Sequence, residues 1–198
     1  MRFLCLGDSL TAGTVGVGYI PFLEELLSGN EYVNLGVNGE TIHGLRRRAE
    51  RLKLHGDAAL VWIGTNDVLM YPNWDDNAES AAADYEAILR LTGALAPKLL
   101  TGPPLLADPA LAREYARSYS AASVLVRVQS ANVRAVFVDI QAAFARFSGT
   151  QFTIDGAHLN NAGARLAAET IADSLRTGTP GNVGPAQTPA PLKQLWND

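Results

Sequence analysis

The chain has 198 residues, of which 47% are hydrophobic and 18% charged, with a formal net charge of −4. This length predicts one compact domain with a sizeable core. The negative net charge indicates no strongly basic surface, so nucleic acid and anionic membrane surfaces are not expected partners. The single cysteine, Cys5, excludes an intramolecular disulfide framework and is expected to be buried and inert.

The predicted secondary structure alternates between strands and helices. Continuous apolar runs, typical of parallel strands covered on both faces, predict strands at Arg2–Leu6, Tyr32–Leu35, Ala58–Ile63, Lys98–Thr101 and Ala135–Ile140. Apolar residues at helical spacing predict helices at Tyr19–Leu27, Ile42–Leu54, Ala78–Leu95, Pro109–Ala131 and Asn160–Leu175. The alternation predicts βαβ units, and hence a three-layer α/β/α sandwich around a five-stranded parallel sheet.

The composition changes near the C-terminus, which divides the chain into a domain at 1–176 and a tail at 177–198. The tail is rich in glycine and proline, which cannot continue a helix. Its last apolar residues, Leu192, Leu195 and Trp196, could dock on the domain or on a second copy, so a homo-oligomer stays open. No segment is apolar enough for a membrane span or a secretory leader, so we expect no stable membrane insertion. A cytoplasmic location is expected unless a leader has been removed.

Four polar stretches carry candidate chemistry: GDSL at 7–10, NLGVNGET at 34–41, GTND at 64–67 and DGAHLN at 155–160. The first three begin where a predicted strand ends. Because the carboxyl ends of parallel strands lie along one edge of a sheet, these three stretches are expected to meet in space.

The first and last stretches contain the residue types of a serine nucleophile and its base. A serine hydroxyl such as that of Ser9 reacts poorly until a base takes its proton, and histidine is the usual base. Asp155 lies three residues before His158, so one turn of backbone can present both side chains together. The aspartate would hold the imidazole in the correct tautomer.

Acyl transfer also needs hydrogen-bond donors for the developing oxyanion. The candidates are the backbone N–H groups of Ser9 and Gly39 and the side-chain amide of Asn66. Each residue has a structural alternative: Ser9 and Asp155 could be helix caps, Gly39 a turn glycine and Asn66 a turn former. The joint order of the four stretches favours the catalytic interpretation.

These stretches resemble the four conserved blocks of the SGNH hydrolases, also called the GDSL esterase/lipase family, over Gly7–Asn160. The resemblance implies a flavodoxin-like α/β/α fold and a triad of Ser9, Asp155 and His158. It implies an oxyanion hole built from Ser9, Gly39 and Asn66.

Two positions depart from the family pattern. Leu159 stands where the last block usually has proline, which is expected to loosen the loop after the histidine. Thr65 fits the looser form of the third block, and neither change removes a catalytic group.

The expected activity is hydrolysis of a small carboxylic ester, with a short acyl or O-acetyl group, through an acyl-enzyme and without a cofactor or metal. Met70, Tyr71 and Trp74 follow the third block and are hypothesised to line an acyl pocket. The same residues would serve an acyltransferase, a lysophospholipase or a thioesterase, and a non-enzymatic binding domain on this fold is a further alternative.

The remaining polar residues near these stretches are expected to be structural. Asp8 and Asp67 are predicted to hold loops by hydrogen bonds to backbone. His43 and His55 are predicted to be surface residues in or beside the helix predicted at 42–54, and the run Arg46–Arg48 is predicted to lie on its solvent face.

Overall fold

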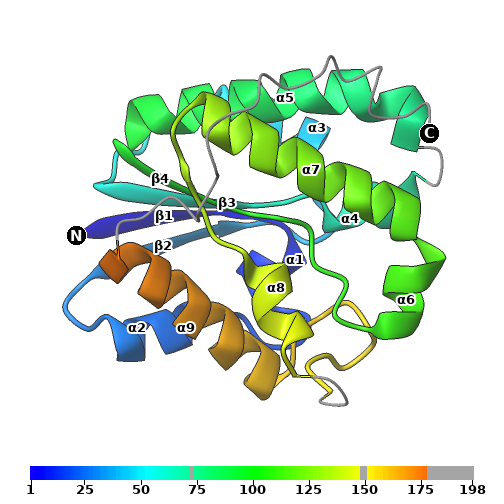
Figure 1. The fold of residues 1–198 in the computed structure, drawn as a ribbon. Helices are drawn as coiled ribbons and strands as arrows, with labels where there is room; N and C mark the ends of the chain where they lie inside the picture. The colour runs from blue at the N-terminus through cyan, green and yellow to red at the C-terminus, as the bar shows by residue number, and fades with distance from the viewer. Residues whose placement is uncertain (72–73, 148–150, 178–198) are drawn as a thin grey trace.

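The computed structural model describes residues 1–71, 74–147 and 151–177, and the side chains of residues 74–76 are outside the description. It confirms the predicted α/β sandwich, a five-stranded parallel sheet with helices on both faces (Figure 1). The tail segment 178–198 lies outside the described residues, so its separation from the domain stays a prediction. No helix in the described part of the chain is long and apolar enough to cross a membrane.

The strands follow the order β2-β1-β3-β4-β5 across the sheet. Their bounds are β1 Arg2–Gly7, β2 Glu31–Gly36, β3 Ala58–Trp62, β4 Lys98–Gly102 and β5 Val136–Phe137. The pairing places the ends of four strands level, because Gly7 pairs with Gly36 and Trp62, and Trp62 pairs with Gly102. The polar stretches that follow β1, β2 and β3 therefore leave the sheet from one edge, as expected.

Two groups of helices cover the sheet. In Figure 1, α3, α5 and α7 lie on one face, and α2, α8 and α9 lie on the other. The helix bounds are α1 Ser9–Ala12, α2 Ile20–Leu26, α3 Ile42–Ala49, α4 Thr65–Met70, α5 Trp74–Leu95, α6 Pro109–Glu114, α7 Ala116–Asn132, α8 Ile140–Ala145 and α9 Asn161–Thr177. The short helices α1, α4 and α6 gather near the carboxyl edge of the sheet.

Alternate residues of each central strand supply the two halves of the core. In β1, Leu4 and Leu6 join the cluster under α3, α5 and α7, while Phe3 and Cys5 join the opposite cluster. This period of two is what a pleated strand imposes. Cys5 is 1% exposed, and burial raises the pKa of its thiol to about 12, as expected for an inert core cysteine.

The region between β4 and β5 differs from the prediction of one long helix. The chain forms two helices, α6 and α7, which meet at Tyr115 with φ −102° and ψ 20°. Asp108 caps α6 by accepting hydrogen bonds from the backbone N–H groups of Ala110 and Leu111, at 2.7 Å and 3.1 Å. The apolar periodicity runs through the junction, so the sequence pattern concealed the break.

The last predicted strand is much shorter than its apolar run. Only Val136 and Phe137 form β5, although the Val138 N–H still donates to the Thr101 carbonyl at 2.8 Å. The chain then begins α8, which was not predicted. Asp139 caps this helix by accepting from the Ala142 N–H at 3.0 Å.

Other boundaries differ by smaller amounts. The predicted helix 42–54 ends earlier, at Ala49, and the predicted helix 78–95 begins earlier, at Trp74. The segment after the third block is helical at both ends, since α4 includes its start and α5 its end. The helices predicted at 19–27 and 160–175 are confirmed as α2 and α9.

Candidate active site

The end of β1 turns sharply into α1. A Cβ atom on Gly7 would lie 2.2 Å from the Trp62 carbonyl oxygen and 2.4 Å from the Thr11 hydroxyl, so only glycine fits there. Asp8 is the N-cap of α1, and its Oδ1 accepts from the Leu10 N–H at 3.0 Å. Ser9 is therefore the first residue of a helix, where the N–H has no intrahelical acceptor.

The structure brings Ser9, His158 and Asp155 together, as the sequence predicted. The Nε2 atom of His158 lies 3.0 Å from the Ser9 Oγ, although the two residues are 149 positions apart. The Nδ1 atom of the same ring lies 2.6 Å from the Asp155 Oδ2. Both ring nitrogens are thus engaged, one by a hydroxyl and the other by a carboxylate.

Asp155 also organises the loop that carries the histidine. Its Oδ1 accepts from the backbone N–H groups of Ala157 at 3.1 Å and His158 at 2.7 Å. Burial acts to raise the pKa of this carboxyl, but hydrogen bonds from the His158 and Ala157 groups outweigh it and hold the pKa below its usual range. Asn160, rather than Asp155, caps α9 by accepting from the Gly163 N–H at 3.1 Å.

The glycine-rich loop at 13–18 packs against the segment that carries the histidine. Gly16 has a φ of +72°, and a Cβ there would lie 2.4 Å from the Leu159 carbonyl oxygen and 3.2 Å from the His158 Cβ. The next N–H, that of Val17, donates to the Leu159 carbonyl at 2.8 Å. Leu159 is 1% exposed in the core, so burial and this bond hold a segment that was expected to be loose.

The second and third stretches meet beside the serine. The Val37 N–H donates to the Gly7 carbonyl at 3.0 Å, which ties the loop after β2 to the end of β1. Gly39, in this loop, has a φ of +71° and is exposed. Asn66 is the second residue of α4, and its Nδ2 donates to the Glu40 carbonyl at 2.9 Å.

Two buried carboxyl groups flank this arrangement. Asp67 accepts from the Ile42 N–H through both oxygens, at 3.1 Å and 3.0 Å, and burial raises its pKa to about 6. Asp8 is 1% exposed, and burial, together with the charges of Asp67 and Glu40, raises its pKa to about 7. Both residues make the backbone hydrogen bonds predicted from the sequence.

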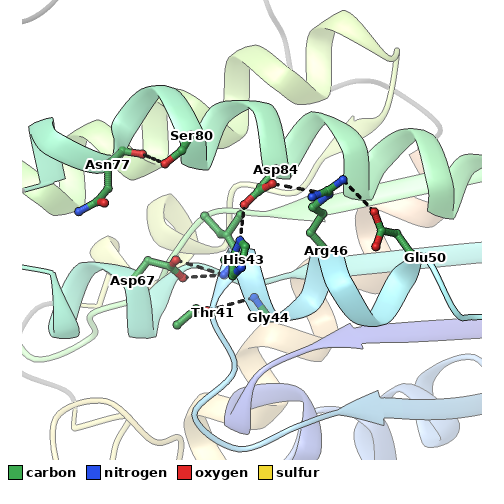
Figure 2. Close-up of polar contacts among 10 residues, drawn as sticks. Thr41, His43, Gly44, Arg46, Glu50, Asp67, Asn77, Ser80 and Asp84 are labelled. Carbon is green, nitrogen blue, oxygen red and sulfur yellow. Dashed lines mark hydrogen bonds and ion pairs between the residues drawn. The ribbon is translucent and has the colours of Figure 1, made fainter.

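The basic run on α3 is only partly solvated, contrary to the prediction. Arg47 is exposed, but Arg48 donates to the Glu40 carboxylate through Nε at 2.9 Å and also through Nη2. Arg46 pairs with Glu50 at 2.8 Å and lies 3.6 Å from Asp84 of α5 (Figure 2).

The two remaining histidines are exposed, as predicted. His43 lies on α3 and also pairs with Asp84, at 2.8 Å, as Figure 2 shows. His55 is exposed as well.

Glu40 and Arg48 are the residues near the site that sequence reasoning missed. Glu40 precedes α3, so the spacing of eight residues between the two side chains follows no helical pairing rule. The only sequence signal for this contact is that Glu40 lies within the polar stretch at 34–41.

The residues hypothesised to line an acyl pocket are at the end of α4 and the start of α5. Met70 is 55% exposed and Tyr71 45% exposed. The side chain of Trp74 lies outside the described residues. A role for these three residues in binding stays a prediction.

Comparison with known proteins agrees with this fold. The family profile described as "GDSL-like Lipase/Acylhydrolase family" matches residues 5–166. The chain therefore belongs to the GDSL-like lipase/acylhydrolase family, and it is a carboxylic ester hydrolase. A search of curated protein sequences finds no match.

Solved structures share the fold at low sequence identity. An acetylxylan esterase from Geobacillus stearothermophilus, Axe2, is 22% identical with a TM-score of 0.77, over 88% of this chain and 93% of its own. LAE5, an alpha/beta hydrolase enzyme from the metagenome of Lake Arreo, Spain, is 22% identical with a TM-score of 0.76, over 87% of this chain and 94% of its own.

Proposed function

We propose that this hydrolase uses Ser9 as its nucleophile, His158 as general base and acid, and Asp155 to orient the imidazole. The observation that carries the proposal is the continuous chain of contacts from the Ser9 Oγ through the histidine ring to the Asp155 carboxylate, at 3.0 Å and 2.6 Å. These distances are those of a nucleophile and base within hydrogen-bond reach. Three crystal structures of Axe2 are described as catalytic mutants, with alanine replacing a serine, an aspartate and a histidine three positions after that aspartate.

The reaction proceeds in two halves. His158 Nε2 takes the Ser9 proton as Oγ attacks the ester carbonyl carbon, and then gives that proton to the departing alkoxide, which leaves an acyl group on Ser9. In the second half the same nitrogen takes a proton from water, whose oxygen attacks the acyl carbon. The C–O bond to Ser9 breaks, the serine regains its proton, and the carboxylic acid departs. Asp155 stays ionised throughout and stabilises the imidazolium.

The oxyanion formed in each half would be received by three donors. The Ser9 N–H has no intrahelical acceptor, and Gly39 presents its backbone without a Cβ. The Asn66 amide has two hydrogens, of which one is used by the Glu40 carbonyl, so the other is available to the substrate oxygen.

For the substrate, we infer a small ester with a short acyl group such as acetyl. The fold is shared with an acetylxylan esterase, and that similarity supports an O-acetyl ester as the first class to test. The triad of Ser9, His158 and Asp155 would also catalyse hydrolysis of lysophospholipids or thioesters, or acyl transfer to an acceptor alcohol. The substrate panel must therefore include those classes.

The proposal is tested by kinetics on p-nitrophenyl esters from acetate to palmitate. We expect kcat/KM to be highest for acetate, and the Ser9→Ala variant to lose at least about 10³-fold in kcat. Ser80→Ala, an exposed serine on α5, is the matched control and should keep wild-type activity.

A maximum at palmitate would overturn the substrate assignment, and an active Ser9→Ala variant would overturn the mechanism. Repeating the assay with acetylated sugars, lysophospholipids, acyl thioesters and added acceptor alcohols decides among the other classes. A product that carries the acyl group on the added alcohol would identify a transferase.

A further inference from the structure

Glu40 lies at the junction of the two segments proposed to receive the oxyanion. It directly follows Gly39, and its carbonyl accepts the Asn66 amide at 2.9 Å. Its own N–H donates to the Val37 carbonyl at 3.2 Å. A displacement of the Glu40 backbone would therefore move both proposed donors, Gly39 and Asn66.

The side chain of Glu40 is held as firmly as its backbone. It is 9% exposed, and its Oε2 accepts from two nitrogens of Arg48, which is 29% exposed. Its other oxygen packs against α3, because a Cβ on Gly44 would lie 3.1 Å from Oε1. A buried carboxylate that loses its cation must rehydrate or move, since burial strongly disfavours an unpaired charge.

The helix that carries Arg48 is itself fixed. At the start of α3, the Ile42 N–H donates to the Asp67 carboxylate, and His43 pairs with Asp84 of α5 (Figure 2). Leu45, on the inner face of α3, is fully buried. Arg48 therefore extends from a rigid support toward a loop that carries the proposed oxyanion donors.

We propose that Arg48 is a positioning residue for the oxyanion site, acting through Glu40. The ion pair holds the Glu40 backbone in place and keeps Gly39 and Asn66 at a fixed separation. It also neutralises a carboxylate close to the point where negative charge develops. This role rests on the proposed function, in which those two residues stabilise the oxyanion.

The test compares two arginines on the same helix. Arg48→Gln removes the ion pair with Glu40, whereas Arg46→Gln removes the pairs with Glu50 and Asp84, which do not reach the 37–41 loop. We expect Arg48→Gln to lower kcat about 10- to 100-fold, which is less than the loss expected when an oxyanion donor is removed altogether. KM should change less than about threefold. Arg46→Gln should stay within about twofold of the wild type in both constants.

A reversible tetrahedral adduct separates positioning from general stability. Phenylboronic acid bound to the serine would place an oxygen in the oxyanion site, so its inhibition constant should rise for Arg48→Gln in parallel with the loss of kcat/KM. Arg48→Lys keeps the charge with a less suited donor geometry and should lose less activity than Arg48→Gln. In the double variant Glu40→Gln with Arg48→Gln, part of the activity should return, because no buried charge is left unpaired.

The inference fails if Arg48→Gln stays within about twofold of Arg46→Gln in kcat, or if the loss is confined to KM. Should Arg48→Gln not fold, the double variant Glu40→Gln with Arg48→Gln decides, because it also lacks the ion pair, and an unchanged kcat in that variant would overturn the role. Failure of the proposed function is distinct, since it would appear as activity that survives in Ser9→Ala.

Discussion

A single side-chain amide, that of Asn66, joins two separate stretches of the site. One of its hydrogens is committed to the Glu40 carbonyl at 2.9 Å, so the orientation of the amide plane is fixed before any substrate arrives. A donor held in this way needs little reorganisation as charge develops, which is the condition for effective oxyanion stabilisation.

Replacing this amide should therefore affect turnover more than binding. We expect Asn66→Ala to lower kcat by about 10²- to 10³-fold while KM changes little. Steady-state kinetics on p-nitrophenyl acetate measures both constants. Asn132→Ala is the control, because that exposed amide bonds to Gln129 near the end of α7. A kcat within about twofold of the wild type would show that Asn66 is not a donor.

Among the structural elements, two loops from opposite ends of the chain support the histidine. The 13–18 loop places Gly16 against His158 and bonds the Leu159 carbonyl through the Val17 N–H at 2.8 Å. The hairpin-like loop that carries the histidine closes on itself, since the Ile154 N–H donates to the His158 carbonyl at 2.9 Å. The backbone of the segment that carries His158 is thus held both by the 13–18 loop and by its own hydrogen bond.

Filling the space between these loops should displace the histidine. Gly16→Ala combines a positive φ with a Cβ 2.4 Å from the Leu159 carbonyl oxygen, so the loops must separate and kcat should fall about tenfold or more. Gly29→Ala is a matched control, because Gly29 also has a positive φ, +81°, but open space around its Cβ position.

Both variants should lose about 1–2 kcal/mol of stability from the left-handed backbone, and Gly16→Ala should lose more because its Cβ also clashes with the Leu159 carbonyl. Urea unfolding measures both losses. Of the two variants, only Gly16→Ala should have a lower kcat than the wild type. Equal kcat values for the two variants would contradict support of the histidine by this loop.

For the molecule as a whole, the sequence predicted the sheet and the three stretches at its edge because both follow from local patterns. Continuous apolar runs identified the five strands, and the chain order of polar blocks identified the side chains that converge. The short helices α4 and α8 were missed, since each has only six residues and lacks a full amphipathic repeat. The break at Tyr115 was missed because the apolar periodicity continues through the junction of α6 and α7.

Contacts between distant segments left no local signal at all. The pairing of Glu40 with Arg48 spans a loop and a helix, and the packing of Gly16 on His158 joins segments 142 positions apart in the sequence. Neither contact has a periodicity, and both depend on how the sheet edge folds the loops together.

The buried acids give the whole molecule a particular dependence of stability on pH. Asp8 and Asp67 have folded-state pKa values raised to about 7 and about 6, mainly by burial, against about 4 in an unfolded chain. At pH values between the unfolded-state and folded-state pKa, the carboxyl groups stay protonated in the folded protein but are ionised in the unfolded chain. Their contribution to stability is therefore full below about pH 4 and falls as the pH rises toward 7.

Asp8→Asn should flatten this dependence, because an amide does not titrate. Between about pH 5 and about pH 8, we expect the wild type to lose on the order of 2 kcal/mol more unfolding free energy than the variant. Urea unfolding at the two pH values measures the difference. Asp173→Asn, an exposed acid on α9 paired with Arg176, should behave as the wild type does. Equal slopes for Asp8→Asn and the wild type would contradict the raised pKa.

The central claim, that Ser9 is the attacking group, is tested most directly by covalent labelling with a fluorophosphonate. We expect one adduct per chain, on the peptide that contains Ser9, with activity lost in proportion to labelling. The Ser9→Ala variant should remain folded and unlabelled. A folded, active wild type that takes no label, or a label found on another serine, would contradict the assignment of Ser9 as the nucleophile.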